Sequence, residues 1–427
     1  MRPPPSSALP PGRPASPRPP RTAPRFDRTT AAAGPSPRRR PAPGGDTATV
    51  LLPDPTAGST VVGNATIGAT VSISGASPGV RRVVFYLDGA YLLTDYSTPY
   101  TFVLPSAKLI DGAHVIEAES LLRDNFTTDR AAVTLTFNNG LSQPPVNTNT
   151  FTPSIGSTPA PGKAFVIAAA GDGAGGDQSA DDVTNLIGSW NPNLFLYLGD
   201  VYEKGSMAEF YNWYGTNNVD FSRFRSISDP TIGNHEYTAG QAPGYFDYWD
   251  NIPHYYSYNA GGWHFISLDS NDNPGFHGLQ PGTAQYTWLQ NDLKANKLAC
   301  TIAYYHHPLF NIGNEPPAVG TAAIWALLEQ NGVDAILNGH DHTYQRWTPM
   351  DASGNPNPNG MPDLIDVTTG HSLGTLPGTA RRRPARVRRV PRRRRDDRRV
   401  HDRRNRRFHL IDHGRRRDSG RQPAVSD

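Results

Sequence analysis

The sequence predicts an all-β sandwich followed by an α/β domain that buries sheet between helices. Short alternating runs separated by turn residues fill residues 48–138. In residues 164–378, apolar runs that end in polar residues alternate with helical stretches instead. With 427 residues the chain is long enough for both domains.

Residues 1–47 precede the sandwich and are rich in Pro, Arg, Ala and Ser. Such a composition buries too little apolar surface to offset chain entropy, so we expect this segment to be disordered. It has no apolar core of a secretory signal. Nothing in the sequence approaches the ~18 consecutive apolar residues of a membrane span, so no span is expected.

Five runs between residues 48 and 138 alternate apolar and polar side chains as β-strands do: VVGNATIGATVSISG, VRRVVFYLDGAYLLTD, YTFVLP, HVIEAESLL and AAVTLTF. Asp88-Gly89 and Asp111-Gly112 stand where turns are expected. This spacing is typical of a β-sandwich. The stretch VVFYLDGAYLLTDYSTPYTFVLP resembles bacterial immunoglobulin-like modules. Because no cysteine pair or ionisable cluster accompanies it, we expect a spacer or adhesion role.

Residues 139–163 are rich in Pro, Ser, Thr and Asn and are interpreted as a linker. Five apolar runs then predict strands: AFVIAAAGD, LFLYLGD, WHFISLDS, ACTIAYYHH and VDAILNGHDH. Residues 181–190 and the stretches GTAQYTWLQNDLKAN and GTAAIWALLEQNG predict the intervening helices. Polar groups gathered at strand ends are the arrangement in which α/β enzymes build sites.

Residues 379–427 form an arginine-rich tail, so the net charge of +3 combines basic ends with an acidic centre. Such a run is a solvated tail, a nucleic-acid-binding arm or a GC-rich coding region translated in the wrong frame. We favour the frameshift and expect no nucleic-acid partner. The segment is predicted to be disordered or frameshifted, and sequencing the DNA around codons 370–385 decides between the readings.

Five short blocks carry the side chains that bind metals. Two hard cations held close together need a bridging carboxylate, further oxygen ligands and imidazoles. The blocks offer Asp172 in GDG, Asp200 in LGDVY, Asn234 in GNHE, His306 in YYHHP, and His340 with His342 in GHDH. Alternation along an extended chain would place the last two on one face. The single cysteine, Cys300, excludes an intrachain disulfide.

Residues 165–370 resemble the calcineurin-like metallophosphoesterase superfamily, closest to its purple-acid-phosphatase-like bacterial members. The family's blocks run GDxG, GDxxY, GNH(D/E), VxxH and GHxH. The resemblance implies a four-layer αββα sandwich with two sheets between helices, preceded here by the immunoglobulin-like sandwich. It also implies two metal ions, in a combination of Fe, Zn or Mn.

The resemblance assigns a role to each block. It implies that Asp200 bridges both metals, with Asp172 and His342 on the first metal and Asn234, His306 and His340 on the second. Pro308 follows the family's spacing after its ligand histidine, which favours His306 over His307. Tyr344 and Arg346 fall in an HxYER-like extension, where Gln345 replaces the acidic residue, and are candidates for substrate binding.

One ligand position departs from the family. Purple members have a tyrosinate three residues after the bridging aspartate, where this chain has Glu203, and Tyr202 comes one residue early. Non-purple members use a DxH histidine, where this chain has Ala174. Three alternatives are open: Tyr202 reaches the first metal through a local bulge, Glu203 or water replaces it, or the site prefers a metal other than Fe(III). On this basis a colourless protein is expected.

The expected function is hydrolysis of phosphoric esters by a metal-activated hydroxide that attacks phosphorus in line. His235, beside Asn234, is the candidate that protonates the leaving oxygen or stabilises the transition state. A small-molecule phosphomonoester is the expected substrate, in an acid-phosphatase-like reaction. The alternatives are a phosphodiesterase and a catalytically inactive metal-binding or adhesion protein. Relatives are often exported, so a secreted or cell-surface location is expected; the sequence indicates no oligomeric state.

Overall fold

The structure is a computed structural model that describes residues 46–366, except residues 77–78, 177, 239 and 272–277. The predictions made for residues 1–45 and for the arginine-rich tail therefore fall outside the described residues. Within residues 46–366, no helix is long and apolar enough to cross a membrane.

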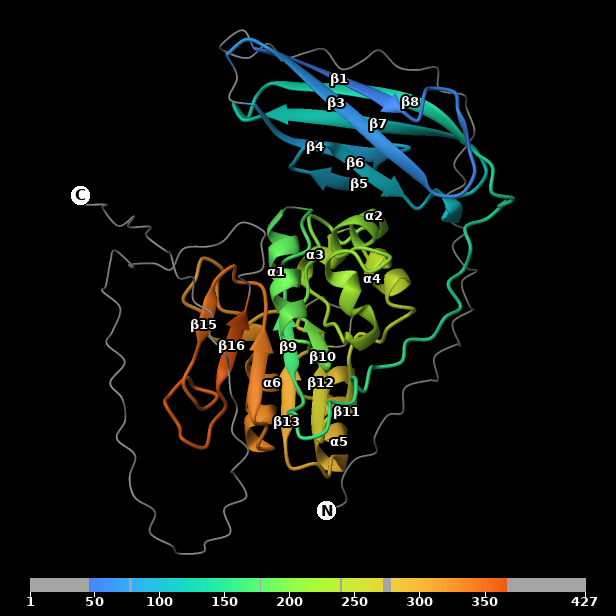
Figure 1. The fold of residues 1–427 in the computed structure, drawn as a ribbon. Helices are drawn as coiled ribbons and strands as arrows, with labels where there is room; N and C mark the ends of the chain where they lie inside the picture. Colours follow the sequence, from blue (N-terminus) through green and yellow to red (C-terminus); the bar gives the residue numbers. More distant parts are fainter. Residues whose placement is uncertain (1–45, 77–78, 177, 239, 272–277, 367–427) are drawn as a thin grey trace, which may run out of the picture. The chain divides into compact units, whose positions relative to one another are not determined.

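The N-terminal part is a β-sandwich of two sheets (Figure 1). One sheet has the order β1-β3-β6, from β1 (Thr47–Asp54), β3 (Ala65–Ser74) and β6 (Tyr100–Leu104). The other has the order β2-β8-β7-β4-β5, from β2 (Thr60–Val61), β4 (Val80–Leu87), β5 (Ala90–Asp95), β7 (Gly112–Leu122) and β8 (Thr128–Phe137). A short 3-10 helix, η1 (Ser106–Lys108), follows β6. The predicted all-β sandwich is confirmed, with β1 as an additional strand.

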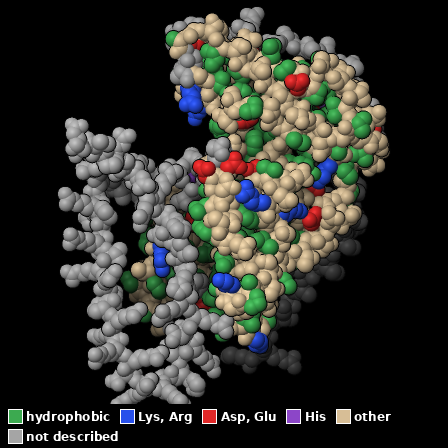
Figure 2. All heavy atoms as spheres, viewed as in Figure 1, with side chains coloured by type: hydrophobic (Ala, Val, Ile, Leu, Met, Phe, Trp, Pro, Cys, Tyr) green, Lys and Arg blue, Asp and Glu red, His purple; other side chains and the backbone are tan. Residues whose placement is uncertain are grey.

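The alternating apolar residues of the sequence form the core of this sandwich. Phe85, Leu93, Phe102 and Phe137 are almost fully buried between the sheets, while their chain neighbours are more exposed. The β4–β5 hairpin turns at Asp88-Gly89, where both residues have positive φ (50° and 81°), as tight hairpin turns require. On the face drawn in Figure 2, apolar side chains are scattered among polar ones.

The second part is an α/β domain with two sheets. The smaller sheet pairs β9 (Ile167–Ala170) in parallel with β10 (Leu194–Tyr197). The larger sheet has the order β11-β12-β13-β14-β16-β15, from β11 (Tyr256–Ala260), β12 (Trp263–Ser267), β13 (Thr301–Tyr304), β14 (Ala335–Asn338), β15 (Tyr344–Arg346) and β16 (Asp363–Asp366). Strands β12, β13, β14 and β16 run parallel, and β11 and β15 are antiparallel edges.

Helices occupy the connections between these strands. They are α1 (Gln178–Ser189), α2 (Met207–Glu209), α3 (Asn234–Tyr237), α4 (Pro243–Tyr248), α5 (Ala284–Ala295) and α6 (Ala322–Gln330), with the π-helix η2 (Phe210–Tyr214) and the 3-10 helices η3 (Asp220–Ile227) and η4 (Val319–Thr321). The three helical stretches expected from sequence correspond to α1, α5 and α6 within a few residues.

Alternate residues of β13 show how the layers stack. Ile302 and Tyr304 belong to the apolar cluster that contains the β10 residues and Ile187 of α1. The intervening Ala303 belongs to a second cluster with Leu289 of α5 and Trp325 of α6. A continuously apolar strand is thus buried on both faces, as the sequence pattern predicts for a parallel sheet between layers. The four-layer α/β sandwich is confirmed.

The aromatic segment between Tyr237 and Tyr258 packs into this core. Tyr245, Tyr248 and Tyr256 are buried, and the hydroxyls of Tyr245 and Tyr256 both point to the Pro230 carbonyl. Most of the predicted functional residues lie elsewhere, in the loops that follow the carboxyl ends of β9, β10, β13 and β14. Asn234 and His235 lie in α3, and Tyr344 and Arg346 lie in β15.

Candidate metal centre

Three of the predicted ligands lie in turns with unusual backbone. Asp172, Asp200 and His340 have φ values of 59°, 62° and 73°. Non-glycine residues are uncommon in this left-handed region, and such residues cluster at functional sites because the surrounding structure must hold them there. Each turn directly follows a strand, so the side chain faces the edge of the sheet.

The glycines before the ligands allow the loops to approach one another. A Cβ on Gly199, which has a φ of 98°, would lie 2.7 Å from Nδ1 of His306. A Cβ on Gly339 would lie 2.6 Å from Oδ2 of Asp172 and 2.9 Å from Nδ1 of His306. The Gly-Asp and Gly-His pairs of the motifs are therefore required by close packing around the ligand atoms.

The first half of the site is rich in oxygen. The Tyr202 hydroxyl donates to Oδ1 of Asp172 at 2.9 Å and lies 2.8 Å from Nε2 of His342. Nε2 of His342 is 3.8 Å from the same carboxylate oxygen. We call Asp172, Asp200, Tyr202 and His342 the oxygen-rich half. Tyr202 thus contacts both other residues predicted for the first metal, although it comes one residue earlier than the family spacing, and its role as a ligand stays a prediction.

His306 joins this half to the other. Its Nε2 lies 3.2 Å from Oδ2 of Asp200 and 3.0 Å from Oδ1 of Asn234. Its Nδ1 lies 2.8 Å from the Leu198 carbonyl, which fixes the ring. A ligating histidine is usually oriented in this way, because its second nitrogen donates to a carbonyl or carboxylate.

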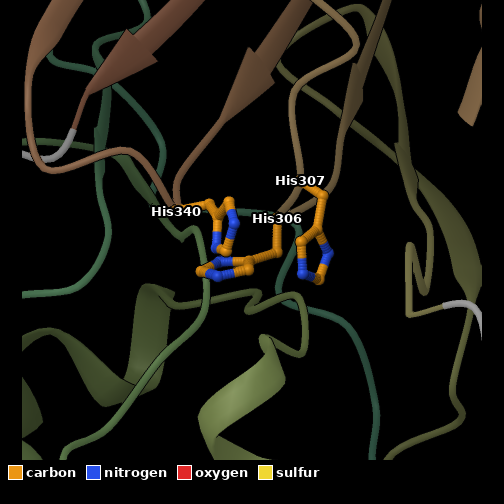
Figure 3. Close-up of side chains that lie close together, drawn as sticks. All are labelled: His306, His307 and His340. Atoms are coloured by element: carbon orange, nitrogen blue, oxygen red, sulfur yellow. The ribbon is translucent and has the colours of Figure 1, made fainter. Parts of the chain in front are cut away.

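The second half is rich in imidazole. The rings of His306, His307 and His340 lie together, the first two from the loop after β13 and the third from the loop after β14 (Figure 3). One nitrogen from each lies within 4.8 Å of the others. We call Asn234, His306, His307 and His340 the imidazole-rich half. Asp172, Asp200 and His306 form a second group with the same spacing of donor atoms.

Buried charges shift the pKa values of these groups in opposite directions. Burial, with the nearby Asp200 charge, raises the pKa of Asp172 to about 6. Burial opposes the charged form of His306, but the Asp200 and Asp172 carboxylates outweigh it and raise the pKa of His306 to about 10. Burial also opposes ionisation of Asp200, yet His306 and His235 hold its pKa well below the usual range.

The pKa values of His307 and His340 shift downward instead. Burial, then the neighbouring His306, lowers the pKa of His340 to about 3 and that of His307 well below its usual range. Neutral imidazoles offer a lone pair to a cation. Buried carboxylates beside neutral imidazoles therefore fit the donor set of a divalent or trivalent metal, and the two donor groups share His306.

His235 lies next to Asp200 and Tyr202. Its backbone N–H donates to Oδ1 of Asp200 at 2.9 Å, and its Nδ1 lies 2.6 Å from the Glu203 carbonyl. Its Nε2 is 3.9 Å from Oδ2 of Asp200, and its ring contacts that of Tyr202. Nδ1 is thus fixed by the backbone, while Nε2 faces the candidate metal ligands.

Glu236 holds the loops of Asp200 and Asn234 together. Its buried carboxylate accepts hydrogen bonds from the backbone N–H groups of Asp200 (3.2 Å), Val201 (2.7 Å) and Gly233 (2.9 Å). Burial raises the pKa of Glu236 to about 8. The acidic position of the GNHE block therefore has a positioning role that the sequence analysis did not assign.

The GHDH segment is a turn, so the expected alternation along a strand is wrong. β14 ends at Asn338 and β15 begins at Tyr344, and the left-handed φ of His340 bends the chain between them. Asp341 nevertheless points away from the ligands. Its buried carboxylate accepts hydrogen bonds from Asn314 N, Thr343 Oγ1 and Gln345 Nε2 at 3.0, 2.6 and 2.6 Å.

The remaining candidates lie outside the two donor groups. Ala174 is buried, and its methyl group offers no ligand. Glu203 belongs to neither group found among the described residues. Tyr344 and Arg346 are exposed on β15, directly after the GHDH turn, and their assignment to substrate binding stays a prediction.

Comparison with known families accounts for both domains. Residues 165–344 match the calcineurin-like phosphoesterase family and residues 49–118 match the bacterial Ig domain family. The first match runs from just before β9 to Tyr344 at the start of β15 and includes the candidate ligands, and the second runs from β1 into β7.

Curated relatives are similar at low identity. Probable purple acid phosphatase 20 of Arabidopsis thaliana is 32% identical over 22% of this chain and 23% of its own length. An uncharacterised protein of Mycobacterium tuberculosis is 27% identical over 46% of this chain and 43% of its own length. Purple acid phosphatase 15 of Arabidopsis thaliana is 26% identical over 42% and 40%. The chain thus spans less than half the length of these relatives.

Proposed function

We propose that the α/β domain is a dinuclear metal-dependent phosphoric ester hydrolase that acts on small phosphomonoesters. The proposal is supported by the two donor groups that share His306. A structural metal site is usually closed and has four ligands, whereas these donors come from four separate loops and include the partly exposed imidazoles of His307 and His340.

Each half of the site would hold one ion. Asp172, Tyr202 and His342 would bind the first, Asn234, His306 and His340 the second, and Asp200 would bridge both. Two such ions lower the pKa of a water and polarise the phosphoryl oxygens. The phenol of Tyr202 replaces the ligand that the family spacing puts elsewhere, because its hydroxyl already contacts Asp172 and His342.

His235 would act on the leaving group. Because Nδ1 is held by the Glu203 carbonyl, the proton of the imidazolium that can be given away is on Nε2. The attacking water would first lose a proton to solvent, and its oxygen would then form a bond to phosphorus while the bond to the alcohol oxygen breaks. The Nε2 proton would move to that alcohol oxygen, and His235 would take up a new proton from solvent. No covalent bond to the protein is needed in this sequence.

Metal removal and restoration test this function. The full chain is treated with a chelator, dialysed and reloaded with Zn, Mn or Fe, and metal content is measured beside turnover of para-nitrophenyl phosphate. Two bound metals per chain and turnover that follows reloading are expected. Turnover unaffected by metal removal overturns the proposal, and two bound metals without turnover would favour the inactive metal-binding alternative. Faster turnover of bis-para-nitrophenyl phosphate would favour the phosphodiesterase.

A further inference from the structure

His307 lies against the candidate metal ligands but has no role in the proposed reaction. Its ring centroid is 4.4 Å from that of His340 and 4.8 Å from that of His306 (Figure 3). One nitrogen of each of the three rings falls within 4.8 Å of the others, which is the spacing of ligands around one ion. The sequence favoured His306 over His307 as the ligand of this adjacent pair.

Hydrogen bonds fix the orientation of the His307 ring. Nδ1 lies 2.8 Å from Oγ of Ser270, and the backbone N–H of His307 donates to the same oxygen at 3.0 Å. Ser270 follows Asp269, whose backbone N–H and C=O bind the buried Gln285 side chain at 2.8 and 2.9 Å. The serine is thus itself held in place.

This arrangement repeats that of His306. In each ring Nδ1 is occupied by a protein oxygen, the Leu198 carbonyl for His306 and the Ser270 hydroxyl for His307. When Nδ1–H donates to such an oxygen, Nε2 carries the lone pair, and ligating histidines are commonly held in this tautomer. Two successive residues therefore lie beside His340, each with Nδ1 engaged by a protein oxygen.

We propose that Nε2 of His307 is a third imidazole ligand of the ion held by Asn234, His306 and His340. This inference rests on the proposed function and adds to it a preference for one metal. Three imidazoles, an amide oxygen and a bridging carboxylate suit Zn(II) or Co(II), whereas Mn(II) is bound best by oxygen ligands. The imidazole-rich half should therefore select Zn(II) over Mn(II).

Cobalt titration of the metal-free full chain tests the ligand. Visible absorption of Co(II) reports ligand number, and competition with Zn(II) reports affinity. His307→Gln should weaken binding of one of two equivalents by at least about 10-fold and change its spectrum. Ser270→Ala, which only frees the ring, should have a smaller effect. His264→Gln is the matched control, because His264 is bonded to Asn259 and Asp292 away from the donor groups.

Rescue separates a ligand from a packing residue. Added imidazole should restore the Co(II) spectrum of His307→Ala but leave His264→Gln unchanged, and melting of the metal-free variants shows whether they fold. Two equivalents bound by His307→Gln with unchanged affinity and spectrum overturn the ligand while leaving the proposed function intact. A wild-type chain that binds no metal overturns both.

Discussion

The two halves of the site differ in the atoms that they present. The oxygen-rich half combines Asp172 with the phenol of Tyr202 and a single imidazole, whereas the imidazole-rich half places three histidine rings beside one amide. Oxygen donors suit hard ions such as Fe(III), and imidazoles suit Zn(II). The contrast teaches that loops at one edge of a sheet can place two unlike sets of donor atoms side by side, with His306 common to both donor groups.

Substitution of Asp200, the proposed bridging carboxylate, should affect metal binding in both halves equally. In Asp200→Asn both halves lose their bridging charge, so neither ion should be retained and turnover should fall by at least about 10³-fold. Metal content by elemental analysis and turnover of para-nitrophenyl phosphate measure this. Asp292→Asn, which alters a partly buried hydrogen bond with His264 instead, should keep both metals. Loss of one ion alone in Asp200→Asn would contradict the bridge.

His235 should affect the reaction without affecting either half. His235→Ala is expected to retain both metals and to lose about 10²–10⁴-fold in kcat, because it removes the proton donor and no ligand. The loss should be greater for an alkyl phosphate than for an aryl phosphate, whose leaving group needs less protonation. Equal and near-normal kcat on both substrates would remove His235 from the mechanism.

Colour distinguishes the two halves directly. The contact of Tyr202 with Asp172 removes the reason for expecting a colourless protein, so Fe(III)-loaded chain should show a visible charge-transfer band. Tyr202→Phe should abolish the band and weaken binding of the first ion by about 10-fold. Tyr304→Phe, a buried phenol bonded to Tyr256 and Tyr258, is the control that should keep both. A band that survives in Tyr202→Phe would assign it to another ligand.

Asp229 is a buried carboxylate outside both halves, and its effect on stability can be compared with that of the buried carboxylates inside them. Burial raises the pKa of Asp229 to about 7 from 3.8. Its contribution to stability is therefore complete below about pH 4 and is lost as pH rises through about 7. Asp229→Asn should remove this loss, stabilising the chain at pH 8 by roughly 2–4 kcal/mol with turnover unchanged. Urea unfolding of metal-free protein at pH 5 and pH 8 measures it; equal pH dependence in both proteins would contradict it.

Much of the fold was predictable because its signals are local. Apolar runs such as LFLYLGD became β10 with Asp200 at its end, and the Asp88-Gly89 turn became a hairpin. The edge strand β11 was not predicted, because its residues are not among the apolar runs that indicated strands. The domain boundaries and ligand roles stay predictions, although the loops bring the proposed ligands together.

The rest of the site depends on how neighbouring loops meet, which spacing alone does not reveal. Whether Tyr202 or Glu203 turns inward is decided by the path of the chain after Asp200. His307 was set aside because family spacing favoured His306, yet Ser270, distant in sequence, orients both its ring and its backbone. Glu236 binds backbone donors from two loops, and only its motif position hinted at this.

The short GHDH turn sets the distance between the two halves of the site. His340 belongs to the imidazole-rich half and His342 to the oxygen-rich half, so two residues of chain set the separation between them. Asp341, between the two, anchors the turn to Asn314, Thr343 and Gln345. A change in that anchor should alter the spacing of both halves at once, so redesign of the site would begin at Asp341, a residue outside both donor groups.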